Sequence, residues 1–298
     1  MSDYHLHLHP HEPAPPGSPP PGEYPAGHIE AYLEAAARRG VTELGFTEHL
    51  YRCVEAADAL GDFWEREPDP RLAAQAEQFV KGERNLSLDT YVGAVQAAKE
   101  RGLPVALGLE VDFFPETIEA VLELVAPYPW DFLLGAVHWV GGWSIDHSEV
   151  ADEFERRGVR RAYEEYFALE VALAGSGAVD VLAHCDVVKK FGHRPPDEPL
   201  DLYRELVRAA SGSGVAVEVS SAGLRKPVAE IYPAPRLLAM LAEAGVPITL
   251  ASDAHAPEDA GWGHQQVVEA ARSPGYTASL HYRARRAEQR SLAEHPGG

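Results

Sequence analysis

The sequence predicts an α/β protein built from parallel βαβ units, which we interpret as one barrel domain spanning residues 1–298. Short apolar runs alternate along the chain with stretches of helical spacing, the pattern of a parallel sheet covered by helices. The length of 298 residues is one that a single α/β barrel commonly has. A hydrophobic content of 45% is enough to bury a sizeable core.

Seven apolar runs are the predicted strands of this sheet. They cover residues 2–6, 43–47, 104–109, 131–137, 179–183, 215–219 and 247–251. Helices are expected between them at residues 30–39, 87–101, 153–173, 200–210 and 235–244. Gly40, Gly102 and Gly245 follow three of these helices, where glycine commonly ends a helix.

Three regions depart from this alternation. Residues 10–27 are rich in proline and 51–86 show no clear strand pattern, so both are expected to be long loops over one face, the first as an insertion. Residues 277–282 predict a further edge strand. The chain from 272 to 298 is a possible appendage with a basic patch of arginines, which we interpret as a solvated helix rather than an intersubunit contact.

Charge and cysteine content narrow the classes of function. The formal net charge of −20 disfavours binding to nucleic acid and to anionic membranes, whereas a small anionic substrate remains compatible with locally clustered cations. Cys53 and Cys185 form no metal-binding pair, so a metal site must use histidines and carboxylates. No apolar run reaches the ~20 residues of a membrane span, and the first ten residues lack a secretory pattern, so a cytoplasmic protein is expected.

Candidate metal ligands follow the predicted strands. His5 and His7 lie two residues apart, which places both side chains on one face of an extended strand. Residues of ligand type also follow the second, third, fourth, fifth and seventh strands, namely His49, Glu110, His138, His184, Asp253 and His255. Because the carboxyl ends of the strands of a parallel barrel meet on one face, these side chains are expected to lie together.

Imidazole and carboxylate ligands without thiolate suit Zn²⁺, Mn²⁺ or Fe, and a shared glutamate can bridge two metals in a hydrolase. The sixth strand is followed instead by Ser220, Ser221, Arg225 and Lys226, which suit an anion better than a metal. The set predicts a metal-dependent hydrolase.

Six segments in order resemble the PHP (polymerase and histidinol phosphatase) superfamily over nearly the whole chain. They are Asp3-Tyr-His-Leu-His7, Gly45-Phe-Thr-Glu-His49, Gly108-Leu-Glu-Val-Asp112, Gly135-Ala-Val-His138, Ala183-His-Cys-Asp186 and Ala251-Ser-Asp-Ala-His255. Three others resemble the histidinol-phosphate phosphatase family in particular: Trp143-Ser-Ile-Asp-His147, Lys189-Lys-Phe-Gly-His193 and Ser221-Ala-Gly-Leu-Arg-Lys-Pro227.

The resemblance implies a distorted (β/α)7 barrel with two or three divalent metals at the C-terminal ends of the strands. His5, His7, Glu110 and Asp253 would hold the first metal, and Glu110 would bridge to a second held by His138 and His184. A third would be held by His49, His255 and one more histidine. The Pro-rich insertion replaces the segment that carries this last ligand in the family; we choose His28, with His11 and then His9 as alternatives.

The resemblance also implies hydrolysis of L-histidinol phosphate to L-histidinol and phosphate in histidine biosynthesis. Arg225, Lys226 and Lys190 would contact the phosphate, and water activated by the metals would attack phosphorus. Catalysis is assigned to Glu110, Asp253 and His255; the last two are also candidates to protonate the leaving alkoxide, which a metal ligand does poorly. The alternatives are a PHP phosphoesterase acting on a nucleotide or another phosphorylated metabolite, and a non-catalytic metal-binding module.

Overall fold

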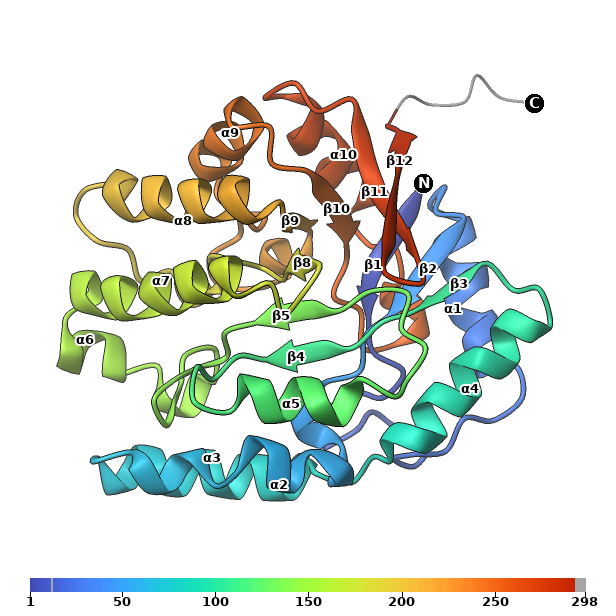
Figure 1. Ribbon diagram of the computed structural model, residues 1–298, viewed down its shortest axis with the longest axis horizontal. Helices are drawn as coiled ribbons and strands as arrows, with labels where there is room; N and C mark the ends of the chain where they lie inside the picture. Colours follow the sequence, from blue (N-terminus) through green and yellow to red (C-terminus); the bar gives the residue numbers. More distant parts are fainter. Residues whose placement is uncertain (12, 293–298) are drawn as a thin grey trace.

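The computed structural model describes residues 1–11 and 13–292, and parallel strands form its centre with helices around them (Figure 1). A three-stranded sheet has the order β1-β2-β3, and a five-stranded sheet has the order β10-β9-β8-β5-β4. All neighbours in both sheets are parallel. The bounds are β1 Ser2–Leu6, β2 Glu43–Phe46, β3 Val105–Leu107, β4 Glu110–Asp112, β5 Leu134–Ala136, β8 Val181–Leu182, β9 Ala216–Ser220 and β10 Ile248–Ala251.

Two single bridges connect the sheets at both edges. Leu6 pairs with Ala254 beyond β10, and His49 beyond β2 pairs with Glu110 at the start of β4. The strands therefore follow one another around a ring, with β3 and β4 together in the place of the third predicted strand. The predicted α/β fold with parallel strands is confirmed.

The helices lie outside this ring (Figure 1). Those between consecutive ring strands are α1 His28–Ala37, α4 Leu88–Glu100, α5 Ile118–Val125, α7 Val159–Ser176, α8 Leu200–Ser213 and α9 Pro235–Glu243, and α10 His264–Arg272 follows β10. The helix expected at 153–173 is divided into α6 Glu153–Arg157 and α7, because Gly158 between them has a φ of 85° that an α-helix cannot contain.

The prediction of a long loop at 51–86 is wrong for much of that stretch. It contains the short helix α2 Ala57–Leu60, the 14-residue helix α3 Pro70–Glu83, and single 3₁₀ turns at Val54–Ala56 and Phe63–Arg66. The side chain of Asp69 caps α3 by accepting a hydrogen bond from the Arg71 amide. Leu72, Ala76 and Val80 recur every four residues and form its buried stripe.

The interpretation of the C-terminal region as a solvated helix is also wrong. Residues Ala278–Arg283 and Arg286–Ser291 form an antiparallel hairpin, β11–β12, which extends the predicted edge strand at 277–282. Leu280 and Tyr282 of β11 are buried. A second small hairpin, β6 Trp139–Val140 with β7 Trp143–Ser144, follows β5. Residues 293–298 of the predicted appendage lie outside the described residues.

The interior of the ring is filled by side chains, chiefly Phe132 and Tyr4, whose ring centroids are 4.9 Å apart. Gly45 and Gly108 leave the space that Phe132 occupies, because a Cβ at Gly108 would lie 2.5 Å from the Phe132 ring. The glycines that open two of the recognised segments thus allow close packing directly beneath the strand ends.

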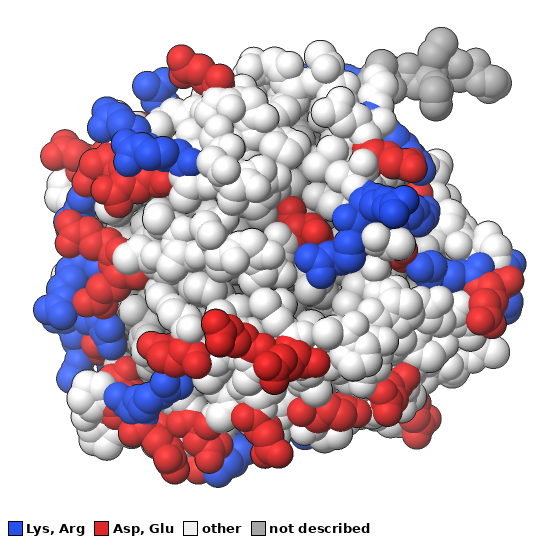
Figure 2. All heavy atoms as spheres, viewed as in Figure 1, with Lys and Arg blue, Asp and Glu red and all other residues white. Residues whose placement is uncertain are grey.

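The described residues include no helix long and apolar enough to cross a membrane. Asp and Glu side chains are spread over much of the face in Figure 2, with Lys and Arg groups among them, as the net charge of −20 requires.

Candidate metal centre

The ring brings the predicted ligands to one end of the strands. His5 lies in β1 and Glu110 opens β4, whereas His7, His49, His138 and His184 follow their strands by one to three residues. The five histidines and Glu110 are buried, and Asp253 and His255 are half-buried. Eight residues that span some 250 positions of sequence therefore share one site, as predicted from the strand ends.

Glu110 lies at the middle of this cluster. Its Oε2 is 2.6 Å from Nδ1 of His49 and 3.5 and 3.6 Å from Nε2 of His5 and His7. Its Oε1 is 3.1 Å from Nε2 of His184 and 3.4 Å from Nε2 of His138. One carboxylate thus faces five imidazoles, the arrangement expected of a bridging ligand.

Asp253 lies close to two of these histidines, His5 and His7. Its Oδ1 lies 3.6 Å from Nε2 of His5 and 3.5 Å from Nε2 of His7. Its φ of 54° places it in the left-handed region, which few residues other than glycine adopt, although Asp and Asn do so more readily than most. Strained backbone of this kind gathers at functional sites.

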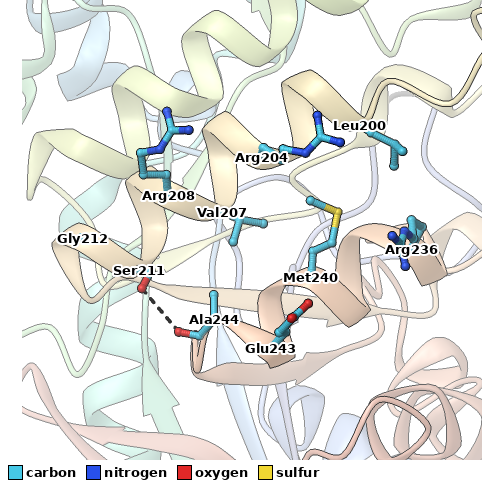
Figure 3. Close-up of a pocket in the computed structure, with 10 residues that line it drawn as sticks. All are labelled: Leu200, Arg204, Val207, Arg208, Ser211, Gly212, Arg236, Met240, Glu243 and Ala244. Atoms are coloured by element: carbon cyan, nitrogen blue, oxygen red, sulfur yellow. Dashed lines mark hydrogen bonds between the residues drawn. The ribbon is translucent and has the colours of Figure 1, made fainter.

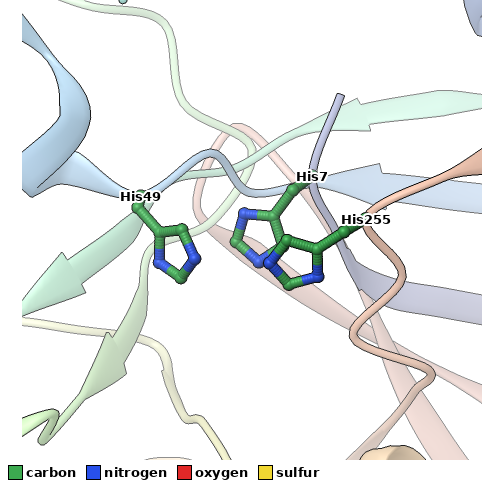
Figure 4. Close-up of side chains that lie close together, drawn as sticks. All are labelled: His7, His49 and His255. Atoms are coloured by element: carbon green, nitrogen blue, oxygen red, sulfur yellow. The ribbon is translucent and has the colours of Figure 1, made fainter. Parts of the chain in front are cut away.

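His7, His49 and His255 lie close together, with the His7 ring against each of the other two (Figure 4). The centroid of His7 lies 4.0 Å from that of His49 and 4.2 Å from that of His255. Nε2 of His49 and Nε2 of His255 are buried and have no hydrogen-bond partner among the described residues. Burying such atoms unpaired costs free energy, so their arrangement fits ligands of a cation.

Three groups in the described chain bring their ligand atoms within 4.8 Å of one another. They are His5–His7–Glu110, His49–Glu110–His138 and His7–His49–His255. Nitrogen and carboxylate oxygen donors without sulfur suit a divalent metal such as zinc or manganese. The site can therefore hold divalent metal ions.

Burial and mutual contact shift the pKa values within the cluster in opposite directions. Burial and the neighbouring His7 hold the pKa of His49 and that of His255 well below the ordinary value. For Glu110, burial opposes ionisation, but His49, His5 and His138 prevail and hold its pKa well below the usual range. At neutral pH His49 and His255 are therefore neutral imidazoles and Glu110 is an ionised carboxylate, which are the forms that bind metals.

Three carboxylates behind the ligands orient them. Glu218 of β9 lies 2.7 Å from Nδ1 of His5, and Asp112 of β4 lies 2.8 Å from Nδ1 of His138. Glu48 accepts the amide of Leu8 at 2.7 Å and so fixes the chain just after His7. Such outer contacts set which imidazole nitrogen faces the metal.

Glu218 and Glu48 were not among the site residues predicted from the sequence. Glu218 had a detectable signal, because it is an acid within an otherwise apolar predicted strand and is fully buried. Glu48 directly precedes His49 but gave no separate signal.

The structure does not bring His28 into the cluster. Its Nε2 lies 2.8 Å from the carbonyl oxygen of Leu8, and its ring is beside Tyr32. His9 is also turned away, with its two nitrogens near Glu48 and the Glu23 carbonyl. His28, the first choice for the further ligand, therefore lies outside the cluster in this structure, with its ring nitrogen held by the chain just after His7.

His11, the predicted alternative, does lie beside the cluster. Its ring centroid is 5.1 Å from that of His49 and 4.9 Å from that of His255. It also lines the cavity that opens above these rings.

That cavity has a volume of about 260 Å³ and contains the three predicted phosphate contacts, Arg225, Lys226 and Lys190. Arg225 is anchored by Asp259 at 2.7 Å and by the Ser252 carbonyl at 2.6 Å. Lys190 pairs with Asp146 at 2.9 Å. Lys226 has no carboxylate partner within the described ranges. The floor of metal ligands and the wall of cations suit a phosphorylated molecule.

A second cavity of about 200 Å³ adjoins the first and has aromatic walls formed by Tyr51, Phe79 and Trp139. His147 also lines it, whereas His193 of the other recognised segment stacks on Phe154. Lys189 is buried in ion pairs with Asp186 and Glu230. Only part of each recognised loop therefore reaches the cavities.

The parallel fold and the cluster of candidate metal ligands indicate a PHP-domain protein, and comparison with known families confirms this class. The PHP-domain profile matches residues 25–222, well over half of the chain. The chain belongs to the PHP-domain family.

Curated relatives that align over most of this chain are described as histidinol-phosphatases. A probable histidinol-phosphatase of Deinococcus radiodurans is 36% identical over 252 residues, which are 84% of this chain and 88% of the relative. The histidinol-phosphatase of Bacillus subtilis is 26% identical over 81% of this chain and 92% of its own length.

Solved structures of the same description share the fold. The histidinol phosphate phosphatase of Lactococcus lactis, complexed with zinc, L-histidinol and phosphate, aligns with a TM-score of 0.69, covering 96% of this chain and 98% of that one at 19% identity. A putative histidinol phosphatase of Listeria monocytogenes aligns with a TM-score of 0.66 over 89% of this chain and 99% of its own, at 18% identity.

Proposed function

We propose that this chain is a metal-dependent phosphomonoesterase that hydrolyses L-histidinol phosphate to L-histidinol and phosphate in histidine biosynthesis. The observation that carries the proposal is the cluster of histidines around Glu110, at the floor of a cavity walled by Arg225, Lys226 and Lys190. The description of the Deinococcus and Bacillus relatives and the ligands of the Lactococcus structure support the choice of substrate.

We assign the ligands of two or three divalent metals, Zn, Mn or Fe, from the contacts in the cluster. His5, His7 and Asp253 would hold the first metal together with Glu110, which would bridge to a second held by His138 and His184. His49 and His255 would hold a third, and His11 replaces His28 as its further ligand. Metals held in this way supply Lewis-acid activation of water and of the phosphoryl oxygens.

Side chains that line the cavity would position the substrate and balance the negative charge of its phosphate. Arg225 presents its guanidinium to the cavity while Asp259 and two backbone carbonyls hold its remaining edge, so little side-chain freedom is lost when phosphate binds. Lys226, without a carboxylate partner among the described residues, supplies uncompensated positive charge. Glu110, Asp253 and His255 would hold the metals that supply the catalytic chemistry.

The alcohol part of the substrate would occupy the adjoining aromatic cavity. Its imidazole ring can lie against Tyr51, Phe79 and Trp139, and Asp146 stands where the two cavities meet. Trp139 lines this space, whereas Asp112 and Asp186 are buried in contacts of their own.

A parallel kinetic screen tests the substrate. Metal-loaded protein is assayed with L-histidinol phosphate, nucleoside monophosphates and nucleoside 3′,5′-bisphosphates, and kcat/KM is expected to be largest for histidinol phosphate. A preference for a nucleotide would replace this substrate but keep the phosphoesterase. Full metal occupancy without hydrolysis of any ester would favour the non-catalytic module.

A pair of histidine variants tests the ligand assignment. His11→Asn is expected to lose affinity for one metal equivalent, measured by metal content after dialysis, whereas His28→Asn is expected to retain every equivalent. The reverse result would restore His28 as the ligand.

A further inference from the structure

A groove between α8 and α9 lies apart from the metal site. Its volume is about 650 Å³, within the range of sites for small molecules, and it shares no lining residue with the two cavities above the histidines. Figure 3 shows that Arg204, Val207 and Arg208 extend from α8, and that Arg236, Met240 and Glu243 extend from α9.

The three arginines of this groove are unpaired within the described part of an acidic protein. No carboxylate lies within ion-pair distance of Arg204, Arg208 or Arg236 in the part of the chain that the structure describes. On the neighbouring α7, by contrast, Arg160 pairs with Glu164 at 2.8 Å and Arg161 pairs with Glu165 at 2.7 Å. With 46 acidic and 26 basic residues, acids to pair with these arginines are abundant elsewhere on the chain.

The positions of the arginines also oppose local helix stability. Arg204 and Arg208 are four residues apart on α8, so that two like charges share one helical face. Arg236 is the second residue of α9, where the positive end of the helix dipole disfavours a cation. Their positive charge is therefore not explained by stabilisation of the helices that carry them.

Between the arginines the groove is apolar. Val207 and Met240 lie between the two helices in Figure 3, and Leu200 adds to the lining. The Ser211 hydroxyl donates to the Ala244 carbonyl at 3.4 Å and joins the helices at one end. A guanidinium suits a carboxylate or phosphate group, and an apolar floor suits a hydrocarbon or aromatic body.

We propose that the groove between α8 and α9 is a second binding site, for a small anion that carries an apolar body. Its anionic group is attracted by the arginines around the rim of the groove, and its body packs on Val207 and Met240. Recognition depends on both parts, because the guanidiniums are exposed to water and an exposed charge pair alone contributes little.

Binding of naphthalene-2-sulfonate to the metal-loaded protein, measured by isothermal titration calorimetry, tests the proposal. A sulfonate is a weak metal ligand, so this probe separates the groove from the metal centre. Saturable binding to one site is expected, with affinity at least about tenfold lower in the Arg204→Gln/Arg208→Gln double variant and in Arg236→Gln. Uncharged 2-naphthylmethanol is expected to bind at least about tenfold more weakly than the anion.

Arg38→Gln is the matched control, because Arg38 is exposed outside this groove and also has no carboxylate partner within the described chain. It should bind the probe as the wild type does, and all variants should keep wild-type circular dichroism and phosphate release. No saturable binding to wild type, equal affinity in the groove variants, or equal affinity for the uncharged analogue would each overturn the proposal.

Discussion

Buried histidines and glutamates occur at both ends of the strand ring, but the glutamates at the two ends have different charge partners. At the end away from the metal centre, Glu43 lies 3.2 Å from Nδ1 of His281 and accepts from Arg283 at 2.9 Å and Arg290 at 3.1 Å. At the metal centre, Glu110 faces imidazoles alone among the described residues, and no Lys or Arg lies within ion-pair distance of it.

This difference separates a structural network from a binding site. Around Glu43 the chain supplies its own cations and tethers the C-terminal hairpin to β2. Around Glu110 the nitrogens of five imidazoles converge on one carboxylate, an arrangement that suits a cation from outside the chain. The same residue types therefore indicate a metal site only where arginine and lysine are missing.

Removing the metals should have the largest effect on the cluster around Glu110 and none on the network around Glu43. We expect chelator-treated protein to lose essentially all phosphate release, because metals held by the cluster would supply the activation of water. Adding back Zn²⁺ or Mn²⁺ should restore it. Activity that persists at vanishing metal content, measured by atomic emission, would contradict the assignment.

Glu218→Gln should weaken metal binding indirectly, through the candidate ligand His5. Glu218 touches His5 but lies beneath the cavity, so the substitution should lower metal affinity or activity by about 10–100-fold without a change in substrate preference. Excess metal should recover part of the loss. Glu269→Gln on the exposed face of α10 is the control and should match wild type.

Glu43→Gln should act on stability rather than activity. An amide cannot balance Arg283 and Arg290, and we expect a loss of about 2–3 kcal/mol in unfolding free energy, since both arginines are partly exposed. Urea titration gives this value. The folded, metal-loaded variant should retain wild-type kcat, and loss of bound metal would contradict the separation of the two networks.

A pH series distinguishes buried glutamates with and without a cation. Burial raises the pKa of Glu170 to about 7, and its hydrogen bond from Tyr166 only partly offsets this. Between its unfolded value near 4.5 and 7 the folded state binds the extra proton, so the stability associated with Glu170 falls as the pH rises through this window.

The glutamine side chain of the Glu170→Gln variant is neutral at every pH, so this variant should not lose stability as the pH rises. Its unfolding free energy relative to wild type should therefore increase by about 2–3 kcal/mol from pH 5 to pH 8. For Glu43, burial opposes ionisation, but hydrogen bonds from His281, Arg283 and Tyr4 hold its pKa well below the usual range, so its stabilising effect should be lost only in acid. A constant difference between Glu170→Gln and wild type across the series would contradict the shift.

The strands and most of the site could be predicted because each depends on local pattern. Apolar runs mark parallel strands buried on both faces, and residues at their ends must converge once the sheet closes. This reasoning located His5, His49, His184 and Glu110 without tertiary information.

The errors fall where contacts distant in sequence decide the structure. Whether His28 or His11 reaches the cluster depends on the path of a Pro-rich segment that has no periodicity. The C-terminal hairpin is held by Glu43 and Tyr4, which lie more than 230 residues earlier. Helix α3, in contrast, had a readable signal in its Asp69-Pro70 start and its four-residue apolar spacing.

The most direct test of the account is phosphate release from L-histidinol phosphate by metal-loaded wild type and by Glu110→Gln. Outer contacts to metal ligands contribute about 10–100-fold, so loss of the Glu110 carboxylate, which contacts five imidazoles, should cost more than about 100-fold while the fold persists. Rapid turnover that the variant loses together with a metal equivalent is the predicted result. Equal turnover by both proteins would contradict the central role of Glu110.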